Sequence, residues 1–122
     1  MLQVIFDSSF LMAVVETPTT WYEDIVDEIG RFQPVLLECV KEELDRLAKG
    51  DGKRARTARL SLELASKFHI DPCGSAHVDD EIVSAAVTCG AIVATADTEL
   101  ARSVNAAHQK VISLRKGRVW LE

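Results

Sequence analysis

Short apolar runs and amphipathic segments alternate along the 122 residues of this chain. The runs are short and rich in β-branched and aromatic residues, which is typical of buried strands. The segments between them repeat apolar residues at the spacing of one helix face. We therefore predict strands at residues 3–6, 32–36, 69–71, 91–95, 111–114 and 119–121.

Capping signals place helices between these strands. Ser8 or Ser9 can cap the first helix, and Thr20-x-x-Glu23 has the pattern of a capping box. Gly90 stands where another helix is expected to end. The predicted helices cover about residues 9–15, 21–29, 38–48, 53–68, 79–89 and 98–105.

This order of elements predicts an α/β fold. Strands that alternate with helices form a mostly parallel sheet covered on both faces, so we expect a three-layer α/β/α sandwich. The helix at 79–89 is apolar on almost every side, which predicts a central position for it. The chain has no repeat, linker or low-complexity segment, and we expect one domain spanning residues 1–122.

The composition favours a globular protein of a reducing compartment. Hydrophobic residues make up 48% and charged residues 27% of the chain, and no apolar run is long enough to cross a membrane. The N-terminus lacks the pattern of a signal sequence. Cys39, Cys73 and Cys89 form no C-x-x-C pair, so we predict buried thiols and a cytoplasmic location. The histidines have no zinc-ligand spacing.

The charge distribution is more informative than the net charge of −5. Ten of the 14 basic residues fall in two regions of the sequence. They either form two solvated surfaces or line a rim that binds phosphates beside an acidic centre. The two regions hold Lys49, Lys53, Arg54, Arg56 and Arg59, and Arg102, Lys110, Arg115, Lys116 and Arg118.

Four separated acids are candidates for that centre. Asp7 ends the first predicted strand, Asp97 follows the strand at 91–95, and Asp79 begins a helix. Glu43 lies at the edge of the apolar stripe of its helix, about 60° from Val40. Ligands of open α/β sheets bind outside the carboxyl ends of the strands, where these acids would meet. Clustered carboxylates repel each other, and an all-oxygen ligand set favours Mg²⁺ or Mn²⁺.

Each acid also has an ordinary structural interpretation. Asp7, Asp79 and Asp97 are good helix caps, and acids in a first turn are stabilised by the helix dipole. Glu43 can extend to solvent or pair with a basic side chain. The joint order of the four acids favours the functional interpretation, since Ser8 and Ser9 can cap the first helix without Asp7.

Four short motifs in this order resemble those of the PIN-domain ribonuclease family. They are Val-Ile-Phe-Asp7-Ser-Ser9-Phe-Leu-Met, Val40-x-x-Glu43-Leu, Asp79-Asp-x-Ile82-x-x-Ala85 and Val93-Ala-Thr95-x-Asp97-x-Glu99-Leu. The resemblance spans almost the whole chain, and no essential acid is missing from it. It implies the α/β/α sandwich predicted above and a metal-dependent ribonuclease, and it leaves open whether cleavage is endo- or exonucleolytic.

The resemblance also implies residue roles and partners. Asp7, Glu43, Asp79 and Asp97 would be catalytic and hold one or two Mg²⁺ or Mn²⁺ ions, with Glu99 as an accessory ligand. The remaining expected site residues are Ser9, Thr95 and Asp80 near the metal, and Lys53, Arg54, Arg56, Arg59 and Arg115 on the RNA. RNA is the expected partner. A homodimer is expected, and a protein partner, either a ribosome-assembly factor or an antitoxin, is compatible with the family. No membrane is implied.

Several functions stay open at this point. Within the family, three features resemble the archaeal and eukaryotic proteins linked to ribosomal-RNA processing, which is the preferred branch: the Asp79-Asp80 pair, the strand Val93-Ala-Thr95 with Asp97-x-Glu99-Leu100, and the ending Val111-Ile-Ser-Leu-Arg115. Toxins of toxin–antitoxin pairs share the same core motifs. A non-catalytic module of this fold would bind RNA or protein without using its acids. A phospho-acceptor signalling domain is disfavoured because Asp7 has no acidic neighbour.

Overall fold

In the computed structural model, which describes residues 1–122, six strands form one sheet with the order β3-β2-β1-β4-β5-β6. All neighbouring strands are parallel except β5 and β6, which form an antiparallel hairpin. The strands are β1 (Leu2–Phe6), β2 (Phe32–Leu37), β3 (His69–Asp71), β4 (Ile92–Thr95), β5 (Val111–Arg115) and β6 (Arg118–Leu121). The helices are α1 (Ser8–Glu16), α2 (Trp21–Ile29), α3 (Glu38–Ala48), α4 (Lys53–Leu64), α5 (Val78–Cys89) and α6 (Thr98–Ala106).

The chain changes direction across the sheet between β1 and β4. From β1 it proceeds to β2 and β3 on one side, and from β4 it proceeds to β5 and β6 on the other. Because parallel crossovers are right-handed, the helices after β1 and after β4 cover opposite faces of the sheet. The predicted three-layer α/β/α fold is confirmed. The carboxyl ends of β1 and β4 lie side by side at the switch point, where α/β proteins bind ligands.

The buried side chains form one continuous core around β1. Val4, Ile5 and Phe6 are at most 1% exposed, as expected for a strand covered on both faces. The Phe6 ring packs within 5.6 Å, centroid to centroid, of the rings of Phe10 and Trp21. The strand that carries Asp7 is therefore fixed by packing on every side.

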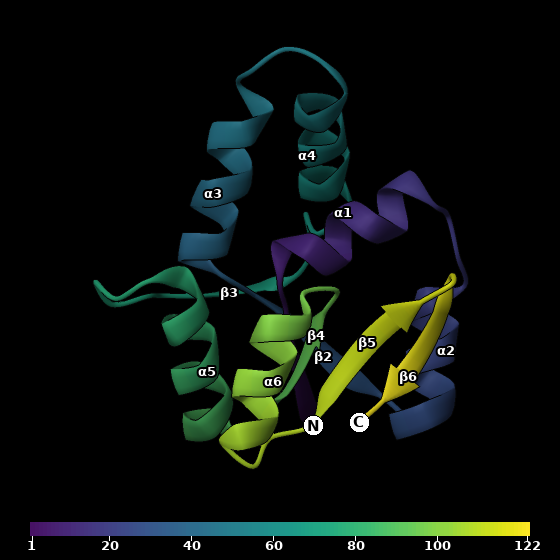
Figure 1. The fold of residues 1–122 in the computed structure, drawn as a ribbon, viewed down its shortest axis with the longest axis vertical. Helices are drawn as coiled ribbons and strands as arrows, with labels where there is room; N and C mark the ends of the chain where they lie inside the picture. The colour runs from purple at the N-terminus through teal and green to yellow at the C-terminus, as the bar shows by residue number, and fades with distance from the viewer.

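The helix pair α3 and α4 projects from the rest of the domain, with its connecting loop at the far tip (Figure 1). α4 begins at this tip at Lys53 and ends at Leu64, four residues before the predicted end. Residues 65–68 form turns instead. None of the six helices has the length and apolar character that crossing a bilayer requires.

Helix α5 is less central than its composition predicts. Only Ile82 and Ala86 are buried, and Val87 is 51% exposed. The helix packs on α6, β1 and β4 through one face, where Val78, Val83 and Ala85 are partly buried against the core, and Val87 lies on the outside. The prediction of a central helix is wrong, because small apolar residues were counted as if each required burial.

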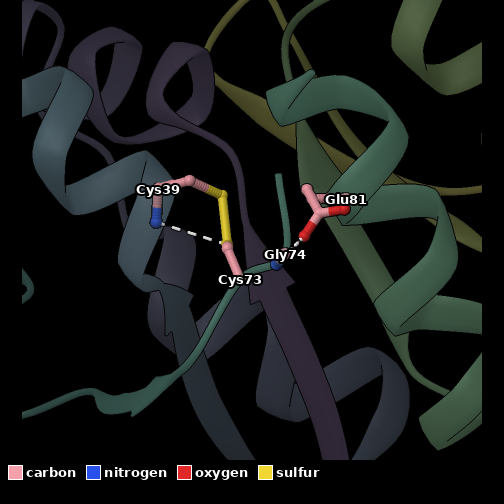
Figure 2. Close-up of a disulfide and its surroundings, with 4 residues drawn as sticks. All are labelled: Cys39, Cys73, Gly74 and Glu81. Atoms are coloured by element: carbon pink, nitrogen blue, oxygen red, sulfur yellow. Dashed lines mark hydrogen bonds between the residues drawn. A yellow bond between two sulfur atoms is a disulfide. The ribbon is translucent and has the colours of Figure 1, made fainter. Parts of the chain in front are cut away.

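Two cysteines form a disulfide, which corrects the prediction of buried, reduced thiols. Cys39 and Cys73 are joined, with their Cα atoms 5.9 Å apart (Figure 2). The parallel register pairs Leu37 with Asp71, so each cysteine lies two residues beyond the same rung of the β2–β3 ladder. The third cysteine, Cys89, is exposed rather than buried. The two cysteines are 34 residues apart in the sequence and become neighbours only through the pairing of β2 with β3, so the sequence alone did not predict the disulfide.

Candidate active site

Asp7 is the buried acid of the site. It follows β1 and occupies the N-cap position of α1, but its side chain makes no capping hydrogen bond. The residue is 6% exposed, and its Oδ2 accepts hydrogen bonds from Ser9 Oγ at 2.5 Å and Thr95 Oγ1 at 2.9 Å. Both hydroxyl residues, Ser9 and Thr95, were expected from the sequence to lie near the acids. Serine and threonine thus hold this carboxylate in one orientation.

Asp97 lies at the carboxyl end of β4, beside Asp7. It caps α6, and its Oδ1 accepts from the backbone N–H groups of Glu99 at 2.8 Å and Leu100 at 3.3 Å. Its own N–H donates to Thr95 Oγ1 at 3.0 Å. The ordinary capping role is therefore real, and it uses one of the two carboxylate oxygens. No protein hydrogen bond occupies Oδ2 of Asp97.

Glu43 enters the site from α3, as its helical position predicts. It is half-buried, whereas its neighbour Glu42 is exposed. Ser8 Oγ donates to Glu43 Oε1 at 2.9 Å and so connects α3 to the beginning of α1. Ser8 was predicted only as a helix cap. Its contact with Glu43 depends on how α1 and α3 pack, which the sequence does not reveal.

Asp79 lies in the first turn of α5 and is exposed. His77, and not Asp79, occupies the N-cap position of this helix, so the carboxylate of Asp79 has no capping role. A hollow of about 430 Å³ is lined by Glu43, His77, Val78, Asp79 and Asp80. His77 is a site residue that sequence reasoning missed, although it stands only two positions before Asp79.

The four acids interact electrostatically. Burial raises the pKa of Asp7, although the hydrogen bonds from Ser9 and Thr95 oppose this, and the charge of Glu43 raises it further. Partial burial also raises the pKa of Asp79, and the charges of Asp7, Asp97 and Glu43 add to the effect. Asp79 therefore experiences the other three acids at once, which is the arrangement that the sequence predicts.

None of these four acids has a basic partner. The ion pairs of the structure lie elsewhere, at Lys41–Asp45, His69–Asp71 and Arg115–Glu122. As the side chains stand, no three histidine, cysteine, aspartate or glutamate residues are close enough to hold one metal ion. Unpaired acids that face one another are costly unless a cation compensates them.

A second hollow, of about 280 Å³, opens on the other side of Asp97. Thr95, Asp97, Arg102, Ser113 and Arg115 are among the residues that line it. Arg115 therefore lies near Asp97, and its role in binding RNA stays a prediction. Arg102 lies there as well. The sequence places it in the second basic region but does not show that it lies beside Asp97, because that depends on how α6 packs on β5.

The other predicted RNA-binding residues lie on α4, which begins at the far tip of the α3–α4 pair (Figure 1). Lys53, Arg54 and Arg56 are exposed there. Arg59 has a structural contact that was not predicted, since its guanidinium donates to the backbone oxygen of Ala48 at 2.8 Å. The side chain of Glu99 makes no hydrogen bond or ion pair with the four acids, and its role stays a prediction.

The fold and this site define a class of protein: a doubly wound α/β domain with acids at the switch point of its sheet. Residues 4–117 match the family model described as a PIN-like domain, and the chain belongs to that family. It matches no curated protein sequence. The family membership expected from the sequence motifs is confirmed.

Three solved structures illustrate the similarity of fold. The PIN domain endonuclease Utp24 is 24% identical with a TM-score of 0.81, over 98% of this chain and 90% of its own. A domain of a functionally unknown protein from Methanocaldococcus jannaschii is 15% identical with a TM-score of 0.63, over 100% and 97%. PAE2754 from Pyrobaculum aerophilum is 17% identical with a TM-score of 0.56, over 86% and 85%. At these identities the similarity establishes the fold.

Proposed function

We propose that residues 1–122 form a single nuclease domain that hydrolyses RNA phosphodiester bonds with the aid of Mg²⁺ or Mn²⁺. The observation that carries the proposal is the state of Asp7. Its carboxylate is buried, held by two hydroxyl groups, without a basic partner, and in the field of Glu43. An unpaired buried carboxylate destabilises the fold, and a bound cation would compensate its charge.

The donor set fits a hard divalent ion. Asp7, Glu43, Asp79 and Asp97 offer only oxygen atoms, and no cysteine or histidine belongs to the group of four. We propose that these four acids hold one or two ions, with Glu99 and Asp80 contributing from nearby. A bound ion would supply a water of lowered pKa and would stabilise the leaving oxygen.

The residues of the chain supply orientation and proton transfer. Ser9 and Thr95 fix the direction of the Asp7 carboxylate, and Ser8 does the same for Glu43. Asp79 is the most exposed of the four acids and has a raised pKa, which suits the group that accepts the proton of the attacking water. Arg115 would bind a phosphate beside the scissile bond.

Cleavage within an RNA chain is supported by the similarity to the PIN domain endonuclease Utp24. The motif Val111-Ile-Ser-Leu-Arg115 favours a role in ribosomal-RNA processing, and the toxin-like alternative rests on the same core motifs. A cytoplasmic location, a homodimer and a protein partner stay predictions.

The first prediction tests the proposed function through Asp97→Asn. In Mn²⁺ we expect wild type to cleave single-stranded RNA and the variant to be at least about 100-fold slower, since losing even an outer partner of a metal costs 10–100-fold. Asparagine caps helices as well as aspartate does, so α6 should remain folded. Mn²⁺ should raise the unfolding midpoint of wild type more than that of the variant.

Glu42→Gln is the matched control, because it removes one acidic charge from the exposed side of α3. It should cleave RNA and respond to Mn²⁺ as wild type does. Full activity of Asp97→Asn would contradict the assignment. Intact RNA binding with no cleavage by any of the three proteins would favour the non-catalytic module.

A further inference from the structure

The open face of the β5–β6 hairpin carries a group of side chains that the proposed function uses only in part. Cross-strand pairing places Arg115 opposite Arg118 and Ser113 opposite Trp120. Directly opposed residues point to the same side of a sheet, and so do alternate residues along a strand. These four side chains therefore share one face of the hairpin.

The opposite face of the hairpin holds it to the domain. Leu114, Val119 and Leu121 pack against the hydrophobic core from that side, and α2 contacts β6. Figure 1 shows α2 behind the hairpin and no helix in front of it. Trp120 is 50% exposed on the open face, so folding does not require its large aromatic surface.

The surroundings of Trp120 are basic. The Arg118 guanidinium carbon lies 5.9 Å from the centre of the Trp120 ring, within cation–π range. A hollow of about 360 Å³ is lined by Arg115, Lys116, Arg118 and Trp120, and no acid lines it. An exposed aromatic face flanked by cations suits a nucleobase with its phosphates.

This basic hollow and the hollow beside Asp97 share one lining residue, Arg115. Arg102 also lines the hollow beside Asp97. β4, β5 and β6 are consecutive neighbours in the sheet, so the path crosses two strand spacings, or about 10 Å. Glu122 also lines the hollow beside Asp97, and it is paired with Arg115 Nη2 at 2.7 Å. The Nη1 group of Arg115 makes no hydrogen bond and is available to a phosphate.

We propose that single-stranded RNA leaves the acidic centre along this face, with phosphates against Arg102, Arg115 and Arg118 and one base stacked on Trp120. This path is a binding site for the RNA substrate of the proposed nuclease, so the inference rests on the proposed function. Stacking on an aromatic ring tolerates every base, so the site positions the strand without selecting its sequence. An acidic peptide would use the cations but has no group that requires the flat ring.

The second prediction concerns binding of a short fluorescent oligouridylate in EDTA, where metal-dependent cleavage is absent. We expect Trp120→Ala to weaken binding about 5-fold or more and Trp120→Phe to restore most of it. Arg118→Ala should reduce the slope of log Kd against log salt by about 0.7, because one phosphate contact is lost. Trp120→Ala should leave that slope unchanged.

Lys67→Ala is the control for charge, since Lys67 is exposed and lies just before β3, at the opposite edge of the sheet. Wild-type affinity for both Trp120→Ala and Arg118→Ala would overturn the path. A protein that binds the oligonucleotide only weakly, but captures an acidic peptide through Trp120, would overturn it in favour of a protein site.

Cleavage assays on the same variants separate this inference from the proposed function. If wild type cleaves RNA but the variants bind and cleave equally well, the path is wrong and the nuclease assignment stands. If wild type binds through Trp120 but never cleaves, the path is supported as a binding site and the nuclease assignment fails.

Discussion

The two adjacent acids at the beginning of α5 have different surroundings. Asp79 and Asp80 both line the hollow beside Glu43. The pKa of Asp79 is raised by Asp7, Asp97 and Glu43, which come from three other elements. Asp79 therefore faces the centre of the site, and Asp80 is one of the charges around it. We therefore propose Asp79, rather than Asp80, as the metal ligand of the pair.

The third prediction compares Asp79→Asn with Asp80→Asn. Both remove one charge from the first turn of α5, so their effects on the helix dipole should be similar. Asp79→Asn should reduce Mn²⁺-dependent cleavage about 100-fold, and Asp80→Asn should reduce it less than about 10-fold. Single-turnover cleavage rates over a range of Mn²⁺ concentrations would test this. Equal losses in the two variants would mean that the acids act together.

At the residue scale, the sequence identifies candidate side chains better than it identifies their contacts. Helical angles and strand ends place Asp7, Glu43 and Asp97 near the carboxyl edge of the sheet. The Ser8–Glu43 hydrogen bond, the neighbourhood of His77 and the position of Arg102 depend on how separate elements pack. Local patterns carry no information about such packing.

At the scale of elements, the Cys39–Cys73 disulfide joins two segments that position the site. Cys39 lies in the first turn of α3, which carries Glu43, and Cys73 begins the segment that leads to α5. Within that segment, the N–H of Gly74 donates to the Glu81 carboxylate in the first turn of α5 (Figure 2). The disulfide and this hydrogen bond together restrict the approach of Asp79 to Glu43.

The fourth prediction is that reduction of this disulfide destabilises the domain. Closing a loop of 34 residues should contribute about 4 kcal/mol, or roughly 15 °C in the unfolding midpoint. The Cys39→Ser/Cys73→Ser variant should unfold at the same lower temperature with or without dithiothreitol. Cys89→Ser should behave as wild type, because Cys89 is free and exposed. An unchanged wild-type midpoint in dithiothreitol would contradict the prediction.

Element types follow from sequence more readily than element positions. Each predicted strand is present, because short apolar runs between turn residues have few alternatives in a chain of alternating helices. The last two strands join through a tight turn, with Lys116 at φ 52° and Gly117 at φ 76°. The packing of α5 differs from its prediction because alanine and valine tolerate exposure, and its position follows from topology rather than composition.

At the scale of the whole molecule, opposite charges occupy separate places. The net charge is −5, yet Arg102, Arg115 and Arg118 lie on one side of the acidic centre. Without a cation, repulsion between the clustered acids lowers the stability of the folded state. Asp7 and Asp79 have raised pKa values there, and in the unfolded chain their pKa returns toward 3.8.

The fifth prediction gives the sign of the resulting pH dependence. Above pH 3.8 and up to the raised pKa values, the native state binds more protons than the unfolded state. The contribution of Asp7 and Asp79 to the free energy of unfolding is therefore fully present below pH 3.8. It is lost as the pH rises through their native pKa values. In EDTA, the unfolding midpoint of Asp7→Asn should increase relative to that of wild type as the pH rises from about 4.5 to about 7.5. Thermal melts across that range would show a widening gap.

In Mn²⁺, wild type should instead have the higher unfolding midpoint. The ion binds the ionised native site and stabilises wild type by mass action, while Asp7→Asn lacks a ligand. Glu42→Gln again serves as the control, since it removes a charge outside the site. A constant difference between wild type and Asp7→Asn at every pH would mean that the substitution acts through packing. A widening gap in EDTA that closes in Mn²⁺ would show that the acids are assembled at a cost in stability that only the bound cation offsets.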